Sequence, residues 1–203
     1  MLHGRVLDPG RCPRCCFRRE VCLCAELPRV EARTRVVIVR HHTERFRASN
    51  SGRLAHLALA GSELRDVFAP GPGEARPEAS DLGIGAGAWL LFPEGEPRTV
   101  APAPPPRELV VLDATWHQAR RMRQRLPALR GLPVLSLATL ATAARMRRSP
   151  DPGRVSTIEA IAAALRLLEG DAVAAPLERL FEVAVGRMQQ TGRPTHPGLP
   201  GGD

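Results

Sequence analysis

Four short, continuous apolar runs along the chain predict strands that are buried on both faces of a sheet. Continuous runs, rather than alternating apolar and polar residues, are typical of parallel strands with helices on both sides. Each run is four residues long, and the last one includes Ser136. The runs are residues 36–39, 89–92, 109–112 and 134–137.

Segments between and after these runs carry apolar residues at helical spacing. The clearest is 156–168, where Ser156 and Glu159 form a capping-box pattern and Gly170 follows the last apolar residue. The alternation of strands and helices predicts an α/β fold with a mostly parallel sheet and flanking helices. The expected helices are 50–60, 116–126, 156–168 and about 176–190.

The rest of the chain is rich in Pro and Gly or in Cys. Two Pro/Gly-rich stretches, 70–87 and 93–106, are expected to be loops. We expect three parts: a Cys-rich metal-binding segment over 1–30, one main domain over 31–190, and a disordered tail over 191–203.

Charge and composition narrow the class of partner. All 29 basic residues are Arg, and the formal net charge of +8 favours a polyanion such as nucleic acid. With two Trp, five Phe and no Tyr, binding that depends on many stacked aromatic rings is excluded. The chain has neither a signal-peptide pattern nor an apolar run long enough to span a bilayer, so we expect a cytoplasmic protein without a membrane partner.

All five cysteines lie between positions 12 and 24. Two close pairs, Cys12 with Cys15 and Cys22 with Cys24, have the spacing of a tetrahedral zinc knuckle with four cysteine ligands. The alternatives are free thiols or a redox pair, although a redox pair would not need four cysteines. A closed site of this kind predicts a structural role, and the spacing leaves open whether Cys15 or its neighbour Cys16 binds the metal.

Asp113 follows the apolar run 109–112 and therefore lies at the carboxyl end of a strand, the edge where α/β sheets bind their ligands. Thr115 and Trp116 then begin the next helix. On their own these residues also fit an ordinary helix cap and an ordinary core position.

The segment 113–116, with the sequence DATW, resembles the D-x-T-W signature of the DTW-domain family. Further blocks resemble that family in the same order along the chain, from about residue 11 to residue 168. They are the four cysteines, the segment 40–44 (RHHTE), Asn50 with Arg53, Phe92 with Pro93, Arg145 with Arg147, and the segment 156–160.

The resemblance implies a fold related to the SPOUT methyltransferases, with a C-terminal trefoil knot that binds S-adenosylmethionine. It implies that the 31–190 domain is catalytic and that tRNA is the partner. The implied reaction moves the 3-amino-3-carboxypropyl group of S-adenosylmethionine to N3 of a tRNA uridine and releases methylthioadenosine.

Roles for individual residues follow from the resemblance and from their chemistry. Asp113 is the candidate general base that removes the N3 proton, with binding of the donor's amino group or helix capping as alternatives. Trp116 also fits a core position, and the capping box also explains Ser156 and Glu159. The expected residues at the donor are Phe92, Pro93, Thr115, Trp116, Leu135, Ser156, Thr157 and Glu159.

A second set of residues is expected to contact the RNA. Arginines on the helix 116–126 and beyond it form a basic track that suits phosphates, although a solvated surface has the same pattern. The expected RNA-contacting residues are His41, Glu44, Asn50, Arg53, Arg120, Arg121, Arg145 and Arg147.

Two other functions remain open at this point. One is an RNA methyltransferase that uses the same donor, and the other is a zinc-stabilised RNA-binding module without activity. The sequence does not identify the tRNA, the modified position or the oligomeric state.

Overall fold

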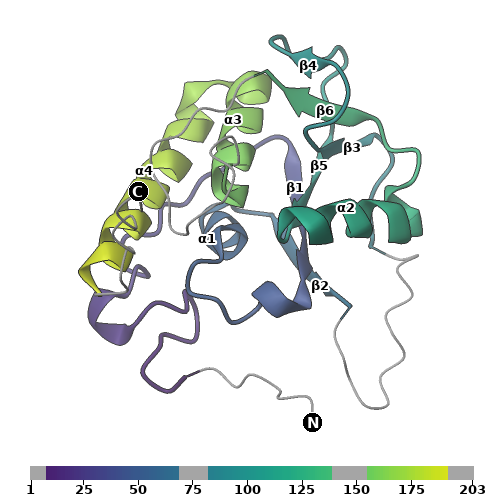
Figure 1. Cartoon of the computed structure of the whole chain (residues 1–203). Helices are drawn as coiled ribbons and strands as arrows, with labels where there is room; N and C mark the ends of the chain where they lie inside the picture. Colours follow the sequence, from purple (N-terminus) through teal and green to yellow (C-terminus); the bar gives the residue numbers. More distant parts are fainter. Residues whose placement is uncertain (1–7, 69–81, 139–154, 192–203) are drawn as a thin grey trace, which may run out of the picture.

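A computed structural model of the chain describes residues 8–68, 82–138 and 155–191. Its centre is a parallel sheet of six strands in the order β2-β1-β5-β3-β6-β4 (Figure 1). The central strands are the most apolar because helices cover both of their faces. The strands are β1 (Arg35–His41), β2 (Glu63–Val67), β3 (Ala88–Leu91), β4 (Pro97–Arg98), β5 (Glu108–Asp113) and β6 (Val134–Leu137).

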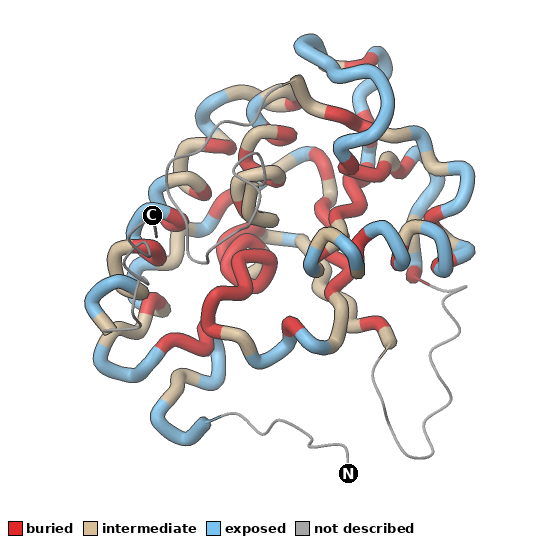
Figure 2. The backbone as a smooth tube through the Cα atoms, viewed as in Figure 1, coloured by how far each residue is buried: buried red, intermediate tan, exposed pale blue. Residues whose placement is uncertain are grey.

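Helices cover the two faces of the sheet unequally. Three helices, α1 (Ser51–Ala58), α3 (Thr157–Glu169) and α4 (Asp171–Gln190), pack on one face, and α2 (Trp116–Arg125) packs on the other (Figure 1). Each face has its own apolar core. Figure 2 shows α1 buried along most of its length, since α3 and α4 lie against it.

The α/β fold class and the mostly parallel sheet are confirmed. The four predicted strands are β1, β3, β5 and β6, with ends that differ by a residue or two. The pattern missed β2 because it is an edge strand that contains polar residues at three of its five positions. It also missed β4, two exposed residues inside the expected loop 93–106.

Helix α4 begins at Asp171, five residues before the predicted start at Pro176. Proline is favoured in the first turn of a helix, which made it a natural start signal. Here the chain reverses at Gly170, where φ is +99°, and α4 begins at once. Burial of Ala174 and Leu177 against the core outweighs the cost of a proline inside the helix.

The Cys-rich segment packs directly on the main core. Phe17 and Leu23 are almost completely buried in the cluster that α1, α3 and α4 form with the sheet. Glu26 also forms an ion pair with Arg187 on α4. The segment is therefore continuous with the main core, and its treatment as a separate unit stays a prediction.

Three earlier expectations depend on residues outside the described ranges. The connection from β6 to α3, residues 139–154, is not described, so the trefoil knot stays a prediction. Most of the expected tail (192–203) and of the first loop (69–81) also lies outside these ranges. Among the described residues, no helix is long and apolar enough to cross a membrane.

We predict that Phe17→Ala lowers the free energy of unfolding by about 3–5 kcal/mol, because it leaves a cavity in the main core. The matched control is Phe46→Ala, since Phe46 is 37% exposed whereas Phe17 is 1% exposed. The control should cost under about 1 kcal/mol. Denaturant unfolding measures both, and equal effects would contradict the packing described for the Cys-rich segment.

Candidate active site and metal centre

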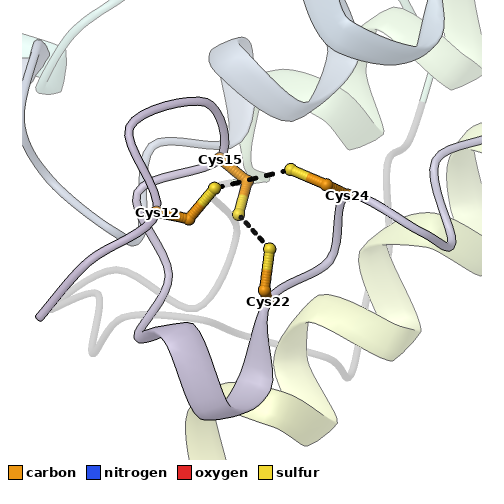
Figure 3. Close-up of side chains that lie close together, drawn as sticks. All are labelled: Cys12, Cys15, Cys22 and Cys24. Atoms are coloured by element: carbon orange, nitrogen blue, oxygen red, sulfur yellow. Dashed lines mark hydrogen bonds between the residues drawn. The ribbon is translucent and has the colours of Figure 1, made fainter.

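Four cysteine sulfurs converge near the N-terminus (Figure 3). The Sγ atoms of Cys12 and Cys24 are 3.6 Å apart, and those of Cys15 and Cys22 are 3.7 Å apart. A tetrahedral zinc site with Zn–S bonds of about 2.3 Å has sulfurs about 3.8 Å apart, whereas a disulfide needs about 2.05 Å. The four cysteines therefore have the geometry to hold a metal ion such as zinc.

Backbone geometry selects Cys15 rather than Cys16 for this cluster. Cys16 has a positive φ of 63°, and its backbone N–H donates to the Cys12 carbonyl oxygen at 2.9 Å. The turn places the Cys16 thiol outside the group of four sulfurs. Burial would raise the pKa of Cys12, but backbone N–H groups of Cys15 and Arg14 lower this pKa to about 6, which favours one thiolate ligand.

Asp113 lies at the carboxyl end of the central strand β5 and is only 2% exposed. Its two carboxylate oxygens accept hydrogen bonds from different helices. The Asn50 side-chain amide donates to Oδ2, and the Thr157 hydroxyl donates to Oδ1 at 2.8 Å. The beginnings of α1 and α3 therefore meet at this carboxylate.

Asn50 does two things at once. Its Oδ1 accepts the backbone N–H of Arg53 at 2.8 Å and so caps α1, while its amide group donates to Asp113. Asn50 therefore links the beginning of α1 to the end of β5. Arg53 itself is buried, and its guanidinium donates to the Arg47 carbonyl oxygen at 3.1 Å.

Gly52 allows the closest approach between α1 and Asp113. A Cβ atom at this position would lie 2.5 Å from the Asp113 Cγ, closer than real Cβ contacts allow. Only glycine therefore fits here without a shift of the carboxylate. The sequence reading passed over Gly52, although a glycine inside an otherwise helical pattern is a signal of such a contact.

The environment of Asp113 disfavours its charged form. Burial raises the pKa of this carboxyl, and the buried Glu44 nearby raises it further. The hydrogen bonds from Asn50 and Thr157 and the charge of Arg40 act in the opposite direction, and burial is the larger effect. A buried carboxyl with a raised pKa is a typical candidate for acid–base chemistry.

His41 does not share this site. Side chains alternate along β1, so His41 points to the face that carries α2, while its neighbour Arg40 points to the face with Asp113. Its Nδ1 lies 3.3 Å from the Gln118 amide nitrogen and 2.9 Å from the Thr43 hydroxyl. Burial lowers the pKa of His41. Glu44, by contrast, is fully buried and pairs with Arg47 at 3.4 Å.

The two aromatic residues expected at the donor, Phe92 and Trp116, also lie on the α2 face. Phe92 and Trp116 stack with ring centroids 5.3 Å apart, and the guanidinium of Arg123 lies over the Phe92 ring at 4.9 Å. Phe92 is buried and Trp116 is half-buried. Thr115 caps α2 and donates its hydroxyl to Gln118 Oε1 at 2.8 Å. These side chains form a second group of polar and aromatic residues, separated from Asp113 by the sheet.

The start of α3 carries the predicted capping box. Glu159 accepts the backbone N–H of Ser156 at 2.8 Å. The buried Ser156 hydroxyl faces the backbone N–H of Glu159 and forms the other half of the box. Thr157, the next residue, binds Asp113.

The remaining predicted residues are scattered. Leu135 is completely buried in the core and Pro93 is exposed. Arg120 and Arg121 are exposed on α2, as the basic track requires. Arg145 and Arg147 lie outside the described residues. The structure thus brings together Asp113, Asn50 and Thr157, with Ser156 and Glu159 beside them on α3.

The DTW domain family model matches residues 10–189, which is most of the chain. The chain belongs to the DTW-domain family. No solved structure matches the chain. The DTW-domain family is associated with tRNA-modifying activity.

Within this DTW domain, sequence reading missed residues whose partners are distant along the chain. Gln118 is one example: its N–H and side chain complete the cap of α2, and its amide reaches Thr43 on the loop after β1 at 3.1 Å. The Thr-x-x-Gln spacing at 115–118 is a capping-box pattern and would have identified Gln118. Nothing in the local pattern identifies its contact with Thr43.

We predict that the purified DTW protein holds about one zinc ion per chain through four cysteines. Cys15→Ser should lose the metal and lower the free energy of unfolding, whereas Cys16→Ser, the matched control next to it, should keep the metal. Elemental analysis by mass spectrometry measures the zinc content. Loss of zinc in Cys16→Ser alone would show that the ligand assignment is wrong.

We predict that Gly52→Ala destabilises the protein by about 1–3 kcal/mol, because the new methyl group overlaps the Asp113 carboxylate. Alanine is otherwise the better helix former by about 1 kcal/mol. Gly186→Ala on α4 is the control, since a Cβ there meets nothing within 4 Å. Thermal unfolding should show opposite signs, and a stabilised Gly52→Ala protein would contradict the close contact.

Proposed function

We propose that this DTW protein is a tRNA-uridine aminocarboxypropyltransferase. It moves the 3-amino-3-carboxypropyl group of S-adenosylmethionine to N3 of a tRNA uridine and releases methylthioadenosine. The observation that carries the proposal is Asp113: a carboxylate buried at the carboxyl end of the central strand, with a raised pKa and two fixed hydrogen bonds.

The chemistry of the acceptor explains why such a carboxylate is needed. Uridine N3 carries a proton and is a poor nucleophile until that proton leaves. As N3 forms its new bond to the transferred carbon and the bond from that carbon to sulfur breaks, the N3 proton goes to Asp113. A raised pKa makes the carboxylate a stronger base, and a stronger base accepts the N3 proton more readily.

Asn50 and Thr157 keep the carboxylate in place. Both donate to Asp113, so neither oxygen can rotate away from the acceptor without the loss of a buried hydrogen bond. Each carboxylate oxygen has more than one lone pair, so each oxygen can accept its hydrogen bond and still accept a proton. Orientation of a reacting group in this way is a large part of catalysis.

The residues around α3 fit the donor. S-adenosylmethionine, when bound, supplies an activated carbon next to a positively charged sulfur. The start of α3 offers backbone N–H groups that no helical carbonyl oxygen accepts, with the hydroxyls of Ser156 and Thr157 beside them. These groups suit an acceptor oxygen of the donor. The half-buried Trp116 lies on the α2 side of the sheet, opposite Asp113. In this proposal it stabilises the fold and belongs to the surface that contacts RNA.

The exposed arginines of α2 are proposed to contact tRNA phosphates. Arg120, Arg121 and Arg125 are exposed on the side of α2 that faces away from the core. Arg123 is excluded from this set because it pairs with Glu94 and packs on Phe92. Recognition through the phosphate backbone makes binding depend strongly on salt concentration.

Mass spectrometry of the RNA product tests the proposal. The zinc-loaded protein is incubated with unmodified tRNA and S-adenosylmethionine, and the digested RNA is searched for aminocarboxypropyl-uridine together with released methylthioadenosine. A methylated nucleoside with S-adenosylhomocysteine would instead identify a methyltransferase. Unchanged RNA that still binds the protein would leave an RNA-binding module.

In the same assay we predict that Asp113→Asn lowers the turnover rate by about 10²–10⁴-fold, because amide nitrogen and oxygen cannot accept the N3 proton. The wild-type rate should fall as pH drops through the raised pKa of Asp113, at a higher pH than an ordinary aspartate gives. Asp171→Asn, at an exposed position on α4, is the control. If Asp113→Asn raises KM for the donor and leaves turnover intact, Asp113 binds the amino group instead.

A further inference from the structure

Three charged residues form a row across neighbouring strands beside the candidate active site. In the parallel register, Arg40 on β1 lies opposite Asp66 on β2 and opposite Asp113 on β5. Side chains alternate along a strand, so all three lie on the face that α1 and α3 cover. Because the row follows the carboxyl ends of the strands, it borders the place where this fold binds ligands.

Asp66 fixes the orientation of Arg40 and leaves one of its nitrogens unused. Nε and Nη2 of Arg40 donate to the two carboxylate oxygens of Asp66, at 2.6 and 2.9 Å. The third nitrogen, Nη1, is buried and has no hydrogen-bond partner within the ranges described. The whole residue is only 5% exposed.

A buried, charged N–H group without a partner is costly, and native proteins rarely keep one without a reason. The pairing with Asp66 makes the position rigid, since a two-point contact fixes the plane of the guanidinium. Arg40 is therefore in place before any ligand arrives, with one donor unused. An anionic group that binds at Nη1 would offset the cost.

We propose that Arg40 Nη1 binds the carboxylate of the amino-acid end of the donor, a role that rests on the proposed function. The amino-acid end of S-adenosylmethionine has both a positive ammonium and a negative carboxylate. The row offers both complements side by side, a cation at Arg40 and an anion at Asp66. Arg40 thus selects a donor that carries an α-carboxylate.

An RNA phosphate is a poorer match for the same nitrogen. A phosphate carries no positive charge to face Asp66, so this carboxylate would repel it. Arg40 is also buried beneath α1 and α3, whereas the arginines that suit a phosphate track are exposed on α2. The charge pattern therefore favours the zwitterionic end of the donor.

The test compares three ligands, two of which differ only in the carboxylate that Arg40 is proposed to contact. They are S-adenosylmethionine, its decarboxylated analogue, and methylthioadenosine, which lacks the whole amino-acid end. Calorimetry measures their affinities for the wild-type protein and for Arg40→Gln. Arg35→Gln is the matched control, because Arg35 lies on the same strand and is also ion-paired, but at the opposite end of the sheet.

The wild-type protein should bind S-adenosylmethionine about 10- to 100-fold more tightly than the decarboxylated analogue, as expected for one charge-assisted hydrogen bond. Arg40→Gln should abolish this difference and leave the affinity for methylthioadenosine unchanged. Arg35→Gln should keep the full difference. The double variant Arg40→Gln/Asp66→Asn leaves no unpaired charge and should behave like Arg40→Gln, which covers the case in which the single variant fails to fold.

Two results would overturn the inference while the proposed function stands. One is that Arg40→Gln, or the double variant, keeps the preference for the carboxylated donor. The other is that these variants weaken only tRNA binding, which would identify a phosphate contact. If the wild-type protein binds neither S-adenosylmethionine nor methylthioadenosine, the proposed function itself fails, and the role of Arg40 fails with it.

Discussion

The buried carboxylate of Asp113 is the constraint around which this domain is arranged. Placing a carboxylate inside the protein costs free energy that only hydrogen bonds and nearby charges can offset. Asn50 from the cap of α1 and Thr157 from the start of α3 supply the hydrogen bonds, and Gly52 supplies the space. A change in the position of either helix would cost this carboxylate one of its two donors.

The sheet divides the DTW domain into two faces that carry different residues. The face with α1 and α3 holds Asp113 and the Arg40–Asp66 pair, and its residues are buried and held by short contacts. The face with α2 holds the Phe92–Trp116 stack and exposed arginines. Small-molecule chemistry suits the first face, because burial strengthens charge interactions, and a large polyanion suits the second.

Local sequence patterns predicted the parts of the molecule that local interactions determine. The cysteine spacing predicted the cluster of four sulfurs, and the apolar run before Asp113 predicted its place at a strand end. The contacts that join elements could not be read in this way, since Asp113 lies 63 residues from Asn50 and 44 from Thr157. His41 was expected to contact RNA because it follows a strand; the alternation of side chains places it on the α2 face, and its contact with RNA stays a prediction.

The packing of the Cys-rich segment against α4 has a consequence for the order of events during synthesis. Phe17 and Leu23 emerge from the ribosome well before α4, which completes their surroundings. The cysteines can therefore meet a metal ion long before the core closes around them. Contacts between segments far apart in a chain also slow folding, because a long loop must close first. Metal uptake by the nascent chain would then precede, and prepare, the docking of α4.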